Sequence, residues 1–226
     1  MEGCRWVHFV WTREVRGVSP GTTLPRGAEA VVAESVQARD ATAEERQRQD
    51  VADIAATLGG DGQAYERLVR RHQAAVARQM WRFTRDRGVL EELVQEVFVQ
   101  AYFSLGRYEG RAPLAHWLSR IAVRVGYRHW KRKARQASDG LAEAHRDDGQ
   151  ATAAETLEAQ EAAELVHAAL AELGPADRLV VTLMHLEQRS VRETAELTGW
   201  TRAAVKVRAL RARRRLGKVL ERRGWS

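Results

Sequence analysis

The chain has 226 residues, a formal net charge of +7 at pH 7, 30% charged residues and 7% aromatic residues. This composition suits one large helical core or two small ones, and the positive balance favours a partner that is nucleic acid or another acidic surface. The single cysteine, Cys4, excludes an intramolecular disulfide and a cysteine-based zinc site. No apolar run reaches the length of a membrane span, so we expect a cytoplasmic protein without direct membrane insertion.

The first 45 residues carry no sustained amphipathic stripe. Pro20, Gly21, Pro25 and Gly27 interrupt them. We therefore predict a poorly ordered N-terminal extension over residues 1–45. A helical pattern begins near residue 43 and stops at Gly59.

A longer helix is predicted over about residues 63–84. Its apolar positions recur at helical spacing, and they are Tyr65, Leu68, Val69, His72, Val76 and Met80. His72 is interpreted as a boundary residue of this stripe, because no second metal ligand stands at helical spacing from it.

The helix predicted over about residues 89–105 has two unlike faces. Its buried stripe comprises Leu90, Leu93, Val94, Val97, Phe98 and Ala101. The opposite side presents Glu92, Gln95, Glu96, Val99 and Phe103. Apolar groups among carboxylates indicate a docking surface for a basic partner. A neighbouring helix that covers Val99 and Phe103 would explain the same pattern, and the sequence leaves both readings open.

After a glycine-containing loop over residues 106–113, a helix is predicted to run from Pro113 to about residue 134. Its core side holds Leu114, Trp117, Leu118, Ile121, Ala122 and Val125. The other side holds His116, Ser119, Arg120, Val123, Tyr127 and Trp130, and the helix ends in a basic run over residues 129–135. Cations interleaved with aromatic rings suit single-stranded nucleic acid. Trp130 could equally pack on an adjacent helix.

Residues 136–156 are polar and acidic, which is typical of a linker. A second helical block follows, with apolar residues at 165–173, a break at Gly174-Pro175 and a further helix over residues 176–186. We therefore predict an all-α fold of two small helical domains, 46–135 and 157–226, joined by a flexible linker at 136–156. The second domain ends in a helix-turn-helix.

The helix-turn-helix prediction rests on residues 190–215. Ser190 and Glu193 have the spacing of a capping box, Gly199 supplies the turn, and Thr201 caps the second helix. Val205 starts an apolar face on that helix, continued by Ala209, Ala212, Leu216 and Val219. The opposite face is basic. The turn glycine and the apolar register favour DNA binding over a merely solvated arginine-rich helix end.

Three stretches in this order resemble extracytoplasmic-function (ECF) sigma factors, the small two-domain branch of the bacterial sigma-70 family. EELVQEVFVQAY (91–102) is similar to the stretch that docks on RNA polymerase. RYEGRAPLAHWLSRIAVRVGYRHWKRKAR (107–135) is similar to the segment that melts and reads the minus-ten element. Residues 173–216 resemble the domain that binds the minus-thirty-five element.

The resemblance implies roles for individual residues. Polymerase docking would use Glu92, Leu93, Gln95, Glu96 and Val99. Capture of the minus-ten single strand would use Tyr108, Arg111, His116, Arg120, Arg124, Tyr127 and Lys131. Contacts to the minus-thirty-five duplex would use Arg202, Lys206, Val207, Arg208, Leu210, Arg211 and Arg214.

The partners implied by the resemblance are core RNA polymerase, promoter DNA and an anti-sigma factor as regulator. No catalytic residue, cofactor or metal is implied, so we expect no enzyme activity. One alternative is a dimeric helix-turn-helix transcriptional regulator, which leaves the helices before the linker unexplained. Another is a metal-dependent nuclease, which lacks supporting ligands around Glu91, Glu92 and Glu96.

Three positions depart from the family pattern. Val89 stands where an acidic residue is common, Thr194 occupies a usually aliphatic core position, and Val207 replaces a small hydroxyl. A valine in the major groove can contact a thymine methyl but cannot hydrogen-bond a base edge. We therefore expect an altered minus-thirty-five preference.

Overall fold

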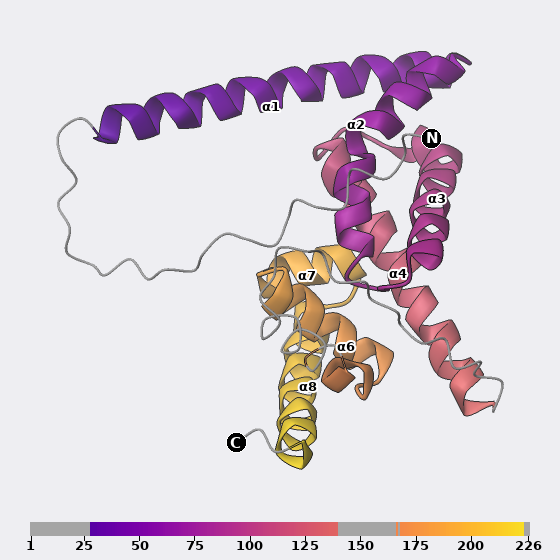
Figure 1. Cartoon of the computed structure of the whole chain (residues 1–226). Helices are drawn as coiled ribbons and strands as arrows, with labels where there is room; N and C mark the ends of the chain where they lie inside the picture. The colour runs from indigo at the N-terminus through magenta and orange to yellow at the C-terminus, as the bar shows by residue number, and fades with distance from the viewer. Residues whose placement is uncertain (1–27, 140–165, 167, 224–226) are drawn as a thin grey trace.

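The computed structural model describes residues 28–139, 166 and 168–223, with side chains from residue 43 onward. Within these ranges every regular element is a helix, which confirms the all-α prediction (Figure 1). Residues 1–27 of the predicted extension and residues 140–156 of the predicted linker lie outside the described residues. No helix in the described part of the chain combines the length and apolarity that a bilayer span needs.

Helix α1 (Ala28–Leu58) begins well before residue 43, where the sequence pattern placed the start of the first helix. The chain contains no glycine or proline between Gly27 and Gly59, and the intervening stretch is rich in alanine, glutamate and glutamine. Intrinsic propensity thus favours a helix where no amphipathic stripe marks one. The first turns of α1 therefore cannot be recognised from the spacing of apolar residues.

Three further helices complete the N-terminal half, and their starts follow local capping chemistry. The Asp61 side chain accepts a hydrogen bond from the backbone N–H of Gln63, and Asp86 does the same for Val89. A 3₁₀ turn follows the third helix. The elements are α2 (Gly62–Met80), α3 (Arg87–Ser104), the turn Leu105–Arg107 and α4 (Leu114–Ser138).

The core of this half forms where α2, α3 and α4 meet, and it contains Met80, Leu93 and Ile121, each at most 2% exposed. Two residues predicted on the open side of α4 are also buried, Val123 at 1% and Trp130 at 4% exposure. The prediction is wrong for Val123, whereas for Trp130 the alternative of packing on an adjacent helix is confirmed. The reason is that α4 is covered on two sides, by α2 and α3 and also by helices after the linker.

A buried acid–base network ties α1 to α2. The Arg71 guanidinium bridges Asp50 and Asp53, and His72 Nε2 lies 3.0 Å from both carboxylate oxygens of Asp50. Burial raises the pKa of Asp53, but hydrogen bonds from Arg71 and Arg67 outweigh it and leave that pKa below its ordinary value. The His72 side chain, which lies at the edge of the apolar stripe of α2, therefore has the Asp50 carboxylate as its partner.

The C-terminal half is a second group of short helices. Pro175 is the first residue of α6, a favoured place for proline, and α6 runs into a π-helical turn. Leu170, Leu179 and Leu183 are almost fully buried among these helices. The elements are helical residues 168–171, α6 (Pro175–Val181), the π turn Thr182–Leu186, α7 (Val191–Thr198) and α8 (Arg202–Arg222).

The two halves pack against each other (Figure 1). Helices α6 and α7 both contact α4. Leu179, Leu183 and Leu197 belong to the same apolar cluster as Leu118 and Trp130 of α4. The apolar core therefore continues across the two groups of helices.

Candidate nucleic-acid interface

Helices α7 and α8 form a helix-turn-helix. The Ser190 hydroxyl accepts a hydrogen bond from the Glu193 backbone, and the Glu193 carboxylate accepts one from the Ser190 backbone, which completes the capping box. Gly199 has a φ of 74°, a left-handed conformation that a side chain strains. Thr201 accepts a hydrogen bond from the Ala204 N–H at 3.1 Å and starts α8. The predicted caps and turn are confirmed.

Helix α8 presents a basic face to solvent. Val205, Ala209, Ala212 and Val219 are buried, so the predicted register of the helix is confirmed. Val207 and Leu210 are about half exposed. The exposed polar positions around them are Arg202, Lys206, Arg211 and Arg214, whereas Arg208 is half-buried. Charged and apolar groups thus share the exposed face of one α-helix, an element that a major groove admits.

Helix α4 carries a stripe of arginines at successive four-residue intervals, Arg120, Arg124 and Arg128. Burial and the like charges of the two flanking arginines lower the pKa of Arg124 below its ordinary value. Like charges at this spacing destabilise a helix. A polyanion that neutralises them gains the energy of counterion release, so the stripe fits a nucleic-acid strand.

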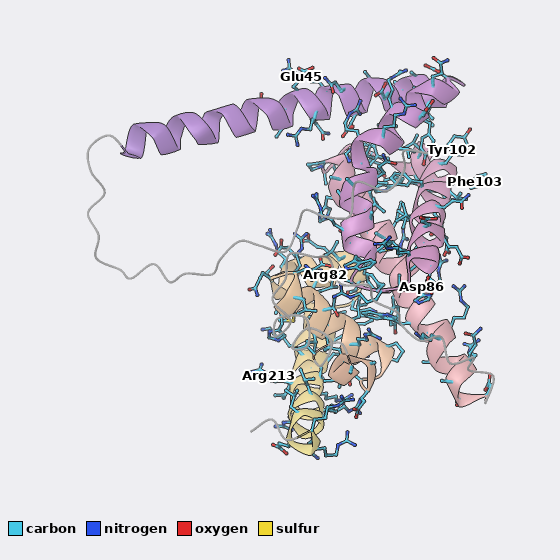
Figure 2. All side chains as sticks on the ribbon, in the orientation of Figure 1. Glu45, Arg82, Asp86, Tyr102, Phe103 and Arg213 are labelled. Atoms are coloured by element: carbon cyan, nitrogen blue, oxygen red, sulfur yellow. The ribbon has the colours of Figure 1, made fainter. Side chains whose placement is uncertain are left out.

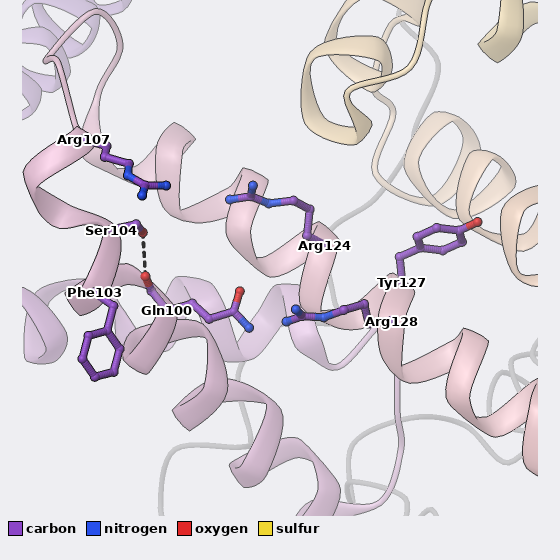
Figure 3. A pocket seen from close by; sticks show the side chains of 7 residues that line it. All are labelled: Gln100, Phe103, Ser104, Arg107, Arg124, Tyr127 and Arg128. Atoms are coloured by element: carbon purple, nitrogen blue, oxygen red, sulfur yellow. Dashed lines mark hydrogen bonds between the residues drawn. The ribbon is translucent and has the colours of Figure 1, made fainter.

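A shallow groove of about 580 Å³ lies between α3 and α4 beside this stripe. In Figure 3 the side chains of Arg107, Arg124 and Arg128 lie along it, with Phe103 at the end towards α3. Tyr127 is turned the other way, towards the C-terminal half. The groove offers cations and an exposed ring, the combination that binds an unstacked base and its phosphates.

The loop before α4 is held by its own contacts. Tyr108 donates a hydrogen bond of 2.6 Å to the Ala112 carbonyl and packs edge-on against Trp117, with ring centroids 5.5 Å apart. Arg111 pairs with Glu109, and His116 is half-buried near the start of the helix. Tyr108 therefore supports the loop, while Arg111 is among its exposed residues.

The outer face of α3 is acidic and apolar. Glu92, Gln95 and Val99 are exposed, and Glu96 forms an ion pair of 2.8 Å with Arg128. Phe103 is 82% exposed, and Tyr102 beside it is 52% exposed. Figure 2 shows both residues at the end of α3 that is remote from the C-terminal half. No helix of the described residues covers Val99 or Phe103, which favours the docking reading.

Leu93 differs from its neighbours in the predicted docking set. It is 2% exposed and belongs to the core between α3 and the helices behind it. A partner on the outer face cannot touch it. Its contribution is to hold α3 in place.

The structure brings the two predicted DNA-binding sets together at Trp200, which sequence reasoning passed over. The Tyr127 and Trp200 rings meet edge-on with centroids 5.7 Å apart, and the Arg208 guanidinium lies 4.5 Å from the Trp200 ring. Lys131 lies 5.9 Å from the Tyr127 ring. The only sequence feature that could have pointed to Trp200 is its position as a large aromatic residue directly after the turn glycine, Gly199. Arg107 and Arg128, which line the groove, were also missed.

Comparison with known families finds two matches in chain order. Residues 68–136 match the family model described as Sigma-70 region 2. Residues 163–216 match the model described as Sigma-70, region 4. The first range contains α3 and most of α4, and the second contains α6, α7 and most of α8.

Curated relatives resemble most of the chain. The ECF RNA polymerase sigma-E factor of Haemophilus influenzae is 30% identical over 68% of this chain and 86% of its own length. The RNA polymerase sigma-E factor of Streptomyces avermitilis is 32% identical, covering 73% of this chain and 89% of the relative. Among solved structures, the sigma factor RpoE of Bartonella quintana, in complex with the anti-sigma factor NepR, has a TM-score of 0.52 at 23% identity, covering 70% of this chain and 96% of that one. This last likeness concerns the fold.

Proposed function

Because the chain belongs to the ECF branch of the sigma-70 family of RNA polymerase sigma factors, we propose that it binds core RNA polymerase through α3 and reads promoter DNA through α4 and α8. It carries out no chemistry itself. Its site of action is the cytoplasm, where polymerase and the chromosome are found. The observation that carries the proposal is that one chain combines the arginine stripe of α4 with the helix-turn-helix of α7 and α8.

Docking on polymerase uses the outer face of α3. Glu92 and Gln95 supply polar contacts to a basic partner surface, and Val99 supplies apolar area about one helical turn beyond Gln95. Glu96 reaches the same surface only if it exchanges its ion pair with Arg128. Exposed ion pairs contribute little stability, so this exchange costs little.

Opening of the minus-ten region uses α4 and the loop before it. Extruding a base from the duplex costs a few kcal/mol of stacking, which a pocket and neighbouring cations can offset. Arg120 and Arg124 neutralise phosphates, while Tyr127 and the groove beside α3 receive bases. Arg111, His116 and Lys131 extend this surface along the strand.

Reading of the minus-thirty-five element uses the exposed face of α8. Lys206, Val207, Leu210 and Arg211 face the major groove, where base edges are distinguished. Arg202, Arg208 and Arg214 contact phosphates, which positions the helix without specifying sequence. An anti-sigma factor that occupies any of these surfaces would block initiation, and we propose such a protein as the regulator.

Run-off transcription with purified core polymerase on candidate promoters tests this function. We expect a discrete transcript start that depends on the added chain. Glu92→Lys should reduce the yield at limiting core polymerase, because it places a cation against the basic docking partner. Glu44→Lys, an equal charge change at an exposed position of α1, is the matched control and should keep full activity. Absence of any discrete start with the unaltered chain on all promoters would sink the proposal.

The alternative of a dimeric helix-turn-helix regulator is not favoured. It accounts for α7 and α8 alone, whereas the family matches cover both halves of the chain.

A further inference from the structure

Glu96 lies at the border between two surfaces of α3. It follows Glu92 by one helical turn, which places it beside the outer face proposed to dock on polymerase. It precedes Gln100 by one turn, and Gln100 lines the groove between α3 and α4. The Glu96 residue is half-buried, whereas Glu92 and Gln95 on the outer face are exposed. A carboxylate at this border can therefore face the groove or the docking partner.

One oxygen of Glu96 binds two groups of the groove. Glu96 Oε1 accepts a hydrogen bond of 2.8 Å from Arg128 Nη2 and one of 3.0 Å from Gln100 Nε2. Figure 3 shows the Gln100 amide and the Arg128 guanidinium turned towards each other in the groove. Two polar groups that line the groove are thus bound by a carboxylate of the proposed docking set.

Arg128 differs in this respect from the other arginines of the α4 stripe. Within the part of the chain that the structure describes, Arg120 and Arg124 have no ion-pair partner, whereas Arg128 is paired with Glu96. A phosphate that approaches Arg128 also meets the Glu96 carboxylate, which repels it. The stripe therefore offers two unpaired cations to a strand, and it gains the third when Glu96 withdraws.

Docking on a basic partner surface supplies a cation that can replace Arg128. The side chains of Glu96 and Arg128 are 39% and 56% exposed, so solvent screens their attraction and the pair is weak. A cation that arrives with the partner competes for the same carboxylate. Once Glu96 is engaged there, the Arg128 guanidinium and the Gln100 amide lose their acceptor. Both can then donate to a phosphate oxygen or a base.

We propose that Arg128 is a further phosphate contact for the minus-ten strand, and that Glu96 binds Arg128 in the free chain and a polymerase cation in the complex. This inference rests on the function proposed above, and it adds Arg128 and Gln100 to the strand-binding set. Arg128 accordingly competes with polymerase for Glu96 when DNA is absent and binds the strand when polymerase is present. The coupling between the two sites is reciprocal. An exposed ion pair limits it to about two- to five-fold in affinity.

The affinity of the full chain for core polymerase, measured without DNA, tests the competition. Arg128→Gln should strengthen this binding by about two- to five-fold, because Glu96 no longer has to leave a partner. The same change in a Glu96→Gln background should have no effect, which separates the pair from long-range charge effects. Arg132→Gln alters an exposed arginine one turn further along α4 and should leave polymerase affinity unchanged. Unchanged or weaker polymerase binding by Arg128→Gln would overturn the proposal.

Binding of a single-stranded minus-ten oligonucleotide tests the phosphate contact. In the complex with core polymerase, Arg128→Gln should reduce the salt slope by about 0.7, whereas in the free chain it should leave the slope unchanged. Glu96→Gln should raise the affinity of the free chain by about two- to five-fold, and this gain should vanish in the double variant. Glu91→Gln removes an exposed charge of α3 that has no ion-pair partner among the described residues, and it should give no such gain.

Equal slope changes in the free chain and in the complex would show that Glu96 does not restrain Arg128, and the proposal would be wrong. Circular dichroism verifies that each variant keeps its helical signal, which we expect because both members of the pair are partly exposed. A failure of the proposed function is distinguishable from a failure of this inference. In the first case the unaltered chain yields no discrete transcript start, whereas in the second it yields one and only the responses of the variants differ.

Discussion

The indole N–H of Trp130 donates a hydrogen bond of 2.7 Å to the backbone carbonyl of Phe83. The two rings are tilted against each other with centroids 4.6 Å apart. Phe83 lies in the irregular turn after α2, so this pair fixes that turn on α4. Trp130 is thereby a structural residue of the N-terminal half, and the reading that placed it on an adjacent element is correct.

Gly126, one helical turn before Trp130, makes room for this pair. A Cβ at residue 126 would overlap the ring of Phe83, which is 2% exposed and has no free space to move into. We therefore predict that Gly126→Ala lowers the free energy of unfolding by about 1–3 kcal/mol. Urea unfolding followed by circular dichroism measures it.

Gly217→Ala is the control for this change, because it alters a glycine of α8 whose Cβ would meet nothing within 4 Å. Helix propensity should make that variant more stable by about 0.5–1 kcal/mol. Equal effects of the two substitutions would contradict the role given to Gly126.

The arginine stripe of α4 should show opposite effects on DNA binding and on stability. Arg124→Gln removes the central charge of three, which relieves repulsion from Arg120 and Arg128. We expect no loss of thermal stability. For the chain in complex with core polymerase, we expect weaker binding of a single-stranded minus-ten oligonucleotide, with a salt slope smaller by about 0.7. Anisotropy titrations at several salt concentrations measure this slope.

Arg46→Gln, an exposed charge on α1, is the comparison for that series and should leave the slope unchanged. A slope that stays the same in Arg124→Gln would remove Arg124 from the DNA-contacting set.

Val207 should determine sequence preference without affecting the fold. Its side chain is 50% exposed on α8, so Val207→Ser removes little buried apolar area. We expect a change in the ranking of minus-thirty-five variants at the base pair that faces residue 207, with unfolding within about 0.5 kcal/mol of the original. Transcription from a promoter library measures the ranking. Identical rankings for both proteins would refute the assignment.

His129 should make stability fall on the acid side. Burial, with the charges of Arg132, Lys133 and Arg178, lowers the pKa of His129 to about 4 from 6.5. Between these values the unfolded chain binds more protons than the folded one, so the free energy of unfolding decreases as pH falls from about 6.5 to about 4. His129→Gln cannot take up this proton and should flatten the decrease.

Urea unfolding at pH 7, 6 and 5 compares the two proteins. Burial raises the pKa of Glu187. Glu187 therefore lowers the free energy of unfolding as pH rises above 4.5, which is the opposite trend to that of His129. The difference between the proteins isolates His129, because Glu187 is present in both. A parallel pH dependence would show that His129 takes no part.

Structural features that depend on residues close together in the chain were predictable from the sequence. The capping box at Ser190, the left-handed Gly199 and the register of Val205 each depend on a few neighbouring positions, and the structure confirms them. The exposed α3 face was also visible as a pattern. Its contact with a partner remains a prediction.

Features decided by distant packing were not predictable. Val123 and Trp130 lie on the face of α4 that a single-sided helix would expose, yet Phe83 and the C-terminal half cover it. The contact between Trp200 and Tyr127 was not predictable, because the two residues are about seventy positions apart and no short sequence pattern indicates which surfaces pack together. The first part of the helix that begins at Ala28 was missed for a different reason. Its residues favour a helix by intrinsic propensity, but its apolar residues do not recur at helical spacing.

The network of Asp50, Asp53 and Arg71 has a mechanical consequence. The described side chains that tie α1 to α2 all belong to the last few turns of α1, whose 31 residues make a rod about 46 Å long. Because the first part of α1 extends away from the other described helices (Figure 1), these turns form a pivot near one end of the rod. A tilt of a few degrees at the two carboxylates is therefore multiplied into a displacement of several ångströms at Ala28.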